Sequence, residues 1–194
     1  MEGFSLMKRL LLTFTVFFTF QTFSSAHASA ENITGHWAYD TLMYSVENGI
    51  LKGDEHNNLN PDKTITRAEY AATLVRALKL NNASATSSFP DVKKDDWFYN
   101  EVSIANTYQL IKGDDKGNFN PQKNISREEM AVILKRAVDH YSYPTEATSL
   151  TFNDTAKISS WAVNDVRSIL SLGLMKGQDG NCLLYTSDAA DEGL

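Results

Sequence analysis

Apolar residues recur every three or four positions along much of this chain, as in helices that bury one face. A first segment of this kind begins at Trp37 and stops at Gly49. A second follows the polar loop after Gly53, and its apolar residues share one face: Tyr70, Ala71, Leu74, Val75 and Leu78. No alternating strand pattern of useful length occurs. The pattern predicts an all-α fold built from helix–loop–helix units.

The helix–loop–helix pattern is repeated along the chain. Three landmarks recur 60 positions apart: Trp37 and Trp97, Gly53 and Gly113, and Arg67 and Arg127. In a third copy, Trp161 and Gly177 lie 64 positions beyond their counterparts in the second copy. One helix pair cannot bury its apolar faces alone, so repeated units stabilise one another by packing. We therefore expect the copies to form a bundle with pseudo-three-fold symmetry.

The third copy is incomplete. After Asn181 the repeat requires an aromatic residue, a proline and a Thr/Ser-Arg pair near position 190, but the chain continues as CLLYTSDAADEGL. We interpret residues 182–194 as a non-native tail, similar to a translated transposon-type sequencing adapter; a degenerate last repeat is the alternative. Because the second helix of this copy is missing, we expect uncovered apolar surface on the first two copies and marginal stability.

The first 30 residues have the features of a secretory signal peptide. Lys8 and Arg9 precede the apolar run Leu10–Phe20, and small-residue cleavage sites follow it. The run is shorter than the about 20 residues that span a bilayer; a retained membrane anchor is the alternative. The expected organisation is a signal peptide (1–30), a first repeat (31–80), a second repeat (89–140), a partial third repeat (150–181) and the tail (182–194).

Composition and charge narrow the possible partners of the exported chain. Charged residues make up 22% of the sequence and hydrophobic residues 42%, as in ordinary soluble globular proteins. The net charge of −6 argues against nonspecific nucleic-acid binding. Cys182 is the single cysteine, so no internal disulfide is possible and the core must hold the domain. We expect a secreted bacterial surface protein with no nucleic-acid partner and no stable membrane insertion after signal cleavage.

Two loops each lead into a predicted helix that has an arginine in its first turn. Ser126 and Glu129 have the spacing of a capping box. Arg127 lies just inside the helix, where free N–H groups and the helix dipole favour an anion. The first copy repeats this arrangement in the sequence Thr66-Arg67-Ala68-Glu69. Both copies therefore predict a helix tip that can bind an anion.

Two other classes of function fit the sequence less well. Asp114, Lys116 and Asn118 alternate as in a calcium loop, but Phe119 and Ile125 stand where such a loop has glycine and glutamate. The histidines share no metal-ligand spacing with acidic residues, and no nucleophile motif occurs. We expect a noncatalytic chain without cofactor or metal. An enzyme whose catalytic domain lies beyond residue 181 is the alternative.

These motifs together resemble the S-layer homology (SLH) domain, over about Asn32 to Asn181, as two complete repeats and a truncated third. The second copy carries the fullest set: Phe89-Pro90-Asp91-Val92, Trp97, Gly113, Phe119, Pro121 and Ser126-Arg127-Glu128-Glu129. The first copy keeps Thr66-Arg67-Ala68-Glu69 but has Leu59 in place of the aromatic residue. The third has Phe152-Asn153-Asp154, Trp161 and Gly177 but lacks the arginine motif.

The resemblance implies a module that anchors proteins noncovalently to pyruvylated secondary cell-wall polysaccharide on the peptidoglycan of bacteria. In that family the grooves between repeats are lined by residues that correspond here to nine polysaccharide-binding candidates: Arg67, Arg127, Asp91, Asp154, Trp37, Trp97, Trp161, Gly53 and Gly113. A pyruvate ketal is a carboxylate that an arginine can grip with two hydrogen bonds, and indole faces suit a sugar ring. Grooves that need a third arginine are expected to be absent. The structural alternatives are helix caps for the aspartates, turns for the glycines and packing anchors for the tryptophans.

Overall fold

The computed structural model describes residues 33–177 and 181–184. Within them the chain forms five α-helices and no β-strand: α2 (Tyr39–Glu47), α3 (Arg67–Ala77), α4 (Tyr99–Thr107), α5 (Arg127–His140) and α6 (Val163–Ser171). A short 3-10 helix, η2 (Thr155–Lys157), precedes α6. The all-α prediction is confirmed. The predicted signal peptide lies outside the described residues, as do residues 185–194.

The second helix of each complete copy begins with a capping box, as the sequence predicts. The Thr66 N–H donates to the Glu69 carboxylate at 2.7 Å, and the Glu69 N–H donates to the Thr66 hydroxyl at 3.2 Å. Ser126 and Glu129 exchange the same two bonds at the start of α5. Each box satisfies N–H groups that the first helical turn leaves without a partner. An arginine is thereby held at the first position of α3 and of α5.

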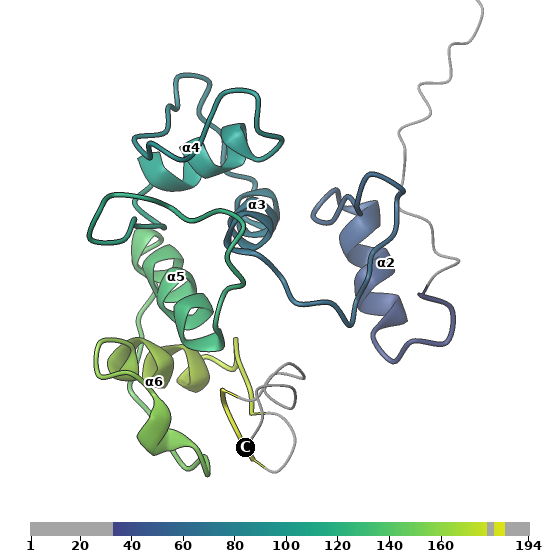
Figure 1. The fold of residues 1–194 in the computed structure, drawn as a ribbon. Helices are drawn as coiled ribbons and strands as arrows, with labels where there is room; N and C mark the ends of the chain where they lie inside the picture. Colours follow the sequence, from purple (N-terminus) through teal and green to yellow (C-terminus); the bar gives the residue numbers. More distant parts are fainter. Residues whose placement is uncertain (1–32, 178–180, 185–194) are drawn as a thin grey trace, which may run out of the picture.

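The helices pack across the copies. α3, the second helix of copy 1, packs against α4, the first helix of copy 2, and α5 packs against α6 in the same way (Figure 1). The larger core joins α3 and α4 around Phe89, Val102, Leu110 and Phe119. A smaller core joins α5 and α6 around Val132, Val166 and Leu183. The described residues therefore contain two of the three helix pairs of the expected bundle.

The remaining helix, α2, lies to one side of the other four in Figure 1. Val46 is its only buried residue, and Tyr44 is largely exposed. By the repeat, its partner would be the second helix of the third copy, which the sequence does not predict.

The loop of copy 2 runs beside the start of α3. The Arg67 N–H donates to the Lys123 carbonyl at 2.9 Å, the Ala68 N–H donates to the Pro121 carbonyl at 3.0 Å, and Thr66 and Asn124 form an isolated antiparallel bridge. Because these are backbone bonds, they fix the position of the loop without depending on the exposed side chains. They place the tip of α3 in the loop of the next copy.

Candidate functional site

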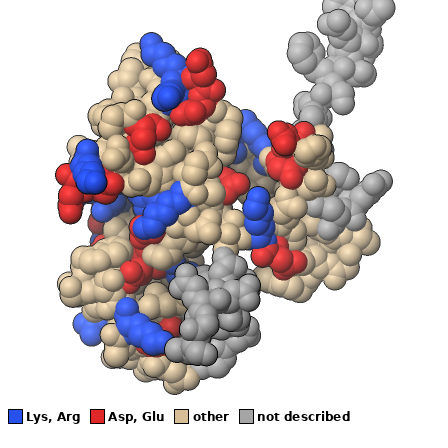
Figure 2. Space-filling view, viewed as in Figure 1, with Lys and Arg blue, Asp and Glu red and all other residues tan. Residues whose placement is uncertain are grey.

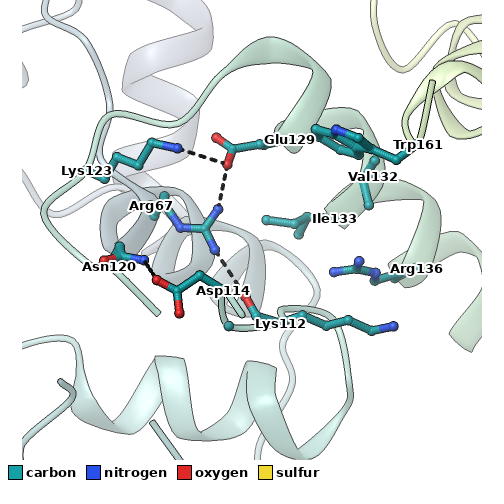
Figure 3. A pocket seen from close by; sticks show the side chains of 11 residues that line it. Arg67, Lys112, Asp114, Asn120, Lys123, Glu129, Val132, Ile133, Arg136 and Trp161 are labelled. Atoms are coloured by element: carbon teal, nitrogen blue, oxygen red, sulfur yellow. Dashed lines mark hydrogen bonds and ion pairs between the residues drawn. The ribbon is translucent and has the colours of Figure 1, made fainter. Parts of the chain in front are cut away.

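A cleft of about 230 Å³ lies where the three copies meet (Figure 3). Its walls are formed by Arg67, Lys112, Gly113, Asp114, Asn120, Lys123, Glu129, Val132, Ile133, Arg136 and Trp161. Three of these were polysaccharide-binding candidates from the sequence: Arg67 of copy 1, Gly113 of copy 2 and Trp161 of copy 3. The fold thus brings together residues that are 94 positions apart in the chain.

Arg67 is held firmly in this cleft. Its Nε donates to the Phe119 carbonyl at 2.8 Å, its Nη2 donates to the Lys112 carbonyl at 3.2 Å, and its Nη1 pairs with Glu129 at 3.1 Å. Its guanidinium carbon lies 5.0 Å from the centre of the Phe119 ring. The side chain is 12% exposed. A guanidinium group has five N–H donors, so the Nη groups retain donors for a ligand after these bonds.

Arg127 makes equivalent contacts in the third copy. Its Nε donates to the Leu183 carbonyl at 2.5 Å and its Nη2 to the Lys176 carbonyl at 2.6 Å. Leu183 and Lys176 each lie 64 positions beyond the residues that hold Arg67, which are Phe119 and Lys112. Burial lowers the pKa of the Arg127 guanidinium, and the negative charge of Asp154 opposes that shift.

The two candidate aspartates hold loops. The Asp91 carboxylate accepts the N–H of Phe119 at 2.8 Å and that of Asn120 at 2.7 Å. Asp154 accepts from the N–H groups of Leu183 at 2.9 Å and Leu184 at 2.7 Å. Burial alone raises the pKa of Asp154, but hydrogen bonds from the Leu183, Leu184 and Asp154 N–H groups, together with the charge of Lys157, lower the pKa overall. Neither aspartate is among the residues that line the cleft.

Leu183 and Leu184 belong to the stretch predicted to be non-native. In the structure they take the positions that Phe119 and Asn120 have in the second copy, and the Leu183 side chain is fully buried. The repeated geometry therefore continues beyond Asn181. Leu183 lies 64 positions beyond Phe119, the same offset that relates Trp161 to Trp97, so the sequence contained a signal for this equivalence. The non-native origin of 182–194 stays a prediction.

The three candidate tryptophans are largely exposed. The exposed fractions are 90% for Trp37, 59% for Trp97 and 57% for Trp161. Trp97 contacts Phe98 edge-on, with ring centres 5.3 Å apart. Trp161 is the one among them that lines the cleft (Figure 3). Because they are not core residues, their indole faces are available for contact with a ligand.

The candidate glycines lie just before tight turns. Gly53 has a φ of 74°, a conformation that side chains disfavour. A Cβ atom on Gly113 would lie 2.9 Å from the Gly117 carbonyl carbon. Gly113 therefore allows two backbone segments to approach each other at the edge of the cleft.

The alternation that resembles a calcium loop has a different explanation in the structure. The Asp114 carboxylate accepts the N–H of Lys116 and that of Asn118, both at 2.9 Å, and the Asn120 amide at 2.9 Å. The Asp54 carboxylate accepts the equivalent bonds in copy 1. These are the bonds of an Asx-type turn. Across residues 33–177 and 181–184, no cluster of three or more acidic, histidine or cysteine side chains is arranged to hold a metal ion.

The cleft contains cations that the sequence reasoning did not select. Lys112, Lys123 and Arg136 join Arg67, while Asp114 and Glu129 are the acidic residues, which gives the lining a formal charge of +2. Figure 2 shows that Lys and Arg are otherwise interspersed with Asp and Glu over the face in view. A local cationic cleft in a chain of net charge −6 favours an anionic ligand. The signal for Lys112 was the lysine that precedes Gly53, Gly113 and Gly177 in every copy.

In the part of the chain that the structure describes, no helix is both long and apolar enough to cross a membrane.

Comparison with known families and proteins adds to this geometry. The family model of the S-layer homology domain matches residues 33–71, 88–131 and 151–181. An amylopullulanase of Thermoanaerobacterium thermosulfurigenes is 34% identical over 152 residues, which cover 77% of this chain and 8% of that protein. The exoglucanase XynX of Acetivibrio thermocellus is 36% identical over 152 residues, covering 77% and 14% of the two chains. The surface-layer 125 kDa protein of Lysinibacillus sphaericus is 31% identical over 158 residues, covering 81% and 13%. The chain thus spans a small part of the length of these relatives.

Proposed function

The chain belongs to the S-layer homology domain family, and from this premise we propose that it is a noncatalytic module that binds a pyruvylated secondary polysaccharide of the bacterial cell wall. Relatives named as S-layer proteins place the protein at the bacterial surface. The ligand is a proposal that rests on the cleft. In this function the module holds whatever protein it is part of against the peptidoglycan.

The observation that carries the proposal is the composite cleft of Arg67, Gly113 and Trp161 (Figure 3). A pyruvate ketal presents a carboxylate on a sugar ring. The remaining N–H donors of Arg67 suit the carboxylate, and the exposed indole of Trp161 suits the apolar face of the ring. The formal charge of +2 in the lining attracts a polymer that the rest of this acidic chain repels.

The other candidates have more indirect roles in this proposal. Asp91 and Asp154 keep the loops of copies 2 and 3 in place by accepting their backbone N–H groups. Arg127 presents a second cationic helix tip at the third copy. Trp37, Trp97 and Gly53 are not among the residues that line the Arg67 cleft. We therefore expect the Arg67 cleft to supply most of the affinity.

Cosedimentation with cell walls tests the proposal. The purified chain is expected to sediment with peptidoglycan sacculi that carry the pyruvylated polymer, and to stay in solution with sacculi stripped of pyruvate. Arg127→Ala is expected to weaken the binding. Equal sedimentation with both preparations would overturn the proposed recognition of the ketal carboxylate.

A second candidate is the anchor portion of a wall-associated enzyme. It is favoured by the relatives named as an amylopullulanase and an exoglucanase, of which this chain matches 8% and 14%. The described residues supply the anchor in either case. Sequencing the uninterrupted gene downstream of Asn181 discriminates the two, because a catalytic domain in frame there would establish the enzyme.

A further inference from the structure

An ion pair fastens α3 to α4. The Arg76 Nε donates to the Glu101 carboxylate at 2.9 Å and its Nη2 at 2.5 Å. Both side chains are mostly buried. The pair joins the last turn of a helix of copy 1 to the first turn of a helix of copy 2, so it fixes the packing of two copies.

The same two positions differ between α5 and α6. Arg136 lies 60 positions beyond Arg76, and Asp165 lies 64 positions beyond Glu101. Aspartate is one methylene shorter than glutamate, and among the ion pairs of the described residues none joins Arg136 to Asp165. The Nη1 of Arg136 instead donates to the Leu110 carbonyl at 3.2 Å.

Arg136, whose guanidinium group forms no ion pair with Asp165, lines the cleft (Figure 3). Burial lowers the pKa of Arg136, the Asp165 carboxylate raises it, and the positive charge of Arg67 lowers it further. Two guanidinium groups therefore repel each other across the cleft. The acidic residue nearest to Arg67, Glu129, is already paired with Arg67 at 3.1 Å and with Lys123 at 3.5 Å.

We propose that Arg136 contacts the ligand directly, as the second arginine of an anion site that it forms together with Arg67. The inference rests on the proposed function, because it takes the ligand of the cleft to be an acidic wall glycan. It adds that a carboxylate of this glycan lies between the two arginines and relieves their repulsion. It also assigns a role to Asp165, whose short side chain leaves Arg136 available.

Lengthening the acidic residue tests this role without removing the arginine. In Asp165→Glu the longer carboxylate is expected to form an ion pair with Arg136, as Glu101 does with Arg76, and so to stabilise the chain. Binding to pyruvylated sacculi is expected to weaken about tenfold, the scale of one charge-assisted hydrogen bond. Arg136→Gln is expected to weaken binding by a similar factor. The matched control is Glu101→Asp, which shortens the acid in the other helix pair and is expected to lower stability with unchanged binding.

The outcomes separate this inference from the function on which it rests. Failure of the unaltered chain to bind pyruvylated sacculi would overturn both. Binding by the unaltered chain together with unchanged affinity in both D165E and R136Q would overturn only the role of Arg136. Equal weakening by E101D and D165E would also overturn it, because a general change in how the copies pack, and not the position of Arg136, would then account for the loss. A crystal structure of D165E establishes whether the new ion pair forms. If the pair does not form, the binding of R136Q decides whether Arg136 contacts the ligand.

Discussion

The Nε of Arg67 donates a hydrogen bond to the Phe119 carbonyl at 2.8 Å and so connects the first turn of α3 to the loop of the next copy. The same guanidinium group pairs with Glu129 and lies over the Phe119 ring. A residue that faces a candidate ligand cleft is therefore also part of what holds two copies together. Under the proposed function, binding and folding therefore depend on the same side chain.

Replacing Arg67 is expected to destabilise the chain. Arg67→Ala leaves the Glu129 carboxylate and two carbonyl groups without this donor, and we expect a loss of about 2–4 kcal/mol in the free energy of unfolding. Arg67→Lys keeps the charge but lacks the planar fork, so it is expected to recover less than half of that loss. Urea unfolding followed by circular dichroism measures both. Lys123→Ala is the control, because its side chain is 62% exposed and we expect a change of about 0.5 kcal/mol or less. Full stability in R67A would contradict the structural role.

The Asp91 carboxylate is expected to order the loop of copy 2. Asp91→Asn preserves the size of the side chain, but its NH₂ group cannot accept one of the two backbone N–H bonds from Phe119 and Asn120. We expect a loss of about 1–3 kcal/mol and faster amide exchange at these two positions. Asp154→Asn is the matched variant in the third copy and is expected to speed exchange at Leu183 and Leu184. Unchanged exchange in both variants would show that the loops are held by other contacts.

The local features of the fold were predictable from the sequence. The capping boxes of α3 and α5 depend on residues three positions apart, so their residue types identify them. The pairing of α3 with α4 was not predicted, because an apolar face does not specify which helix covers it. The bonds of Asp91 to residues 28 and 29 positions away were missed for the same reason. Local spacing contains little information about such distant partners.

The candidate site was predicted in part. Motif positions identified Arg67, Gly113 and Trp161, and the fold brings these three together. Arg136 was missed because an arginine on a helix resembles any solvated surface residue. Under our proposal Arg136 can reach a ligand because Asp165 is shorter than Glu101. The sequence does not show that these two acids are equivalent until α5 and α6 are known to pack as α3 and α4 do.

The loop of copy 1 is expected to lose stability in acid. Hydrogen bonds from the Asn58 N–H and the Asn60 amide lower the pKa of Asp54 from 3.8 to about 2. Because the folded-state pKa lies below the unfolded one, the carboxylate stabilises the fold above about pH 4, and this contribution disappears as the pH falls through about 2. NMR titration of the Asp54 carboxyl group should show the low midpoint. The stability difference between the unaltered chain and Asp54→Asn should be larger at pH 5 than at pH 2; equal differences would contradict the prediction.

Gly113 is expected to be irreplaceable at the edge of the cleft. A Cβ atom there would lie 2.9 Å from the carbonyl carbon and 3.0 Å from the oxygen of Gly117, so Gly113→Ala must open the turn. We expect lower stability together with weaker binding to pyruvylated sacculi. Gly49→Ala is the control, because its strain comes from a φ of 69° and its Cβ would meet nothing within 4 Å. That variant should lose about 1 kcal/mol but bind normally. Normal binding by G113A would exclude this turn from the recognition surface.

Trp161 and Trp97 allow a test of whether the cleft, and not exposed indole in general, binds the glycan. Their exposed fractions are nearly equal, 57% and 59%, but Trp161 lines the cleft with Arg67. Trp161→Ala is expected to weaken binding to pyruvylated sacculi about tenfold through loss of sugar stacking, whereas Trp97→Ala should change it by less than about twofold. Because both side chains are largely outside the core, the free energy of unfolding should change little in either variant. Cosedimentation at several protein concentrations measures the affinities. An equal loss in the two variants would point to a ligand that uses both tryptophans, and an unchanged affinity in W161A would remove the stacking contact from the proposed site.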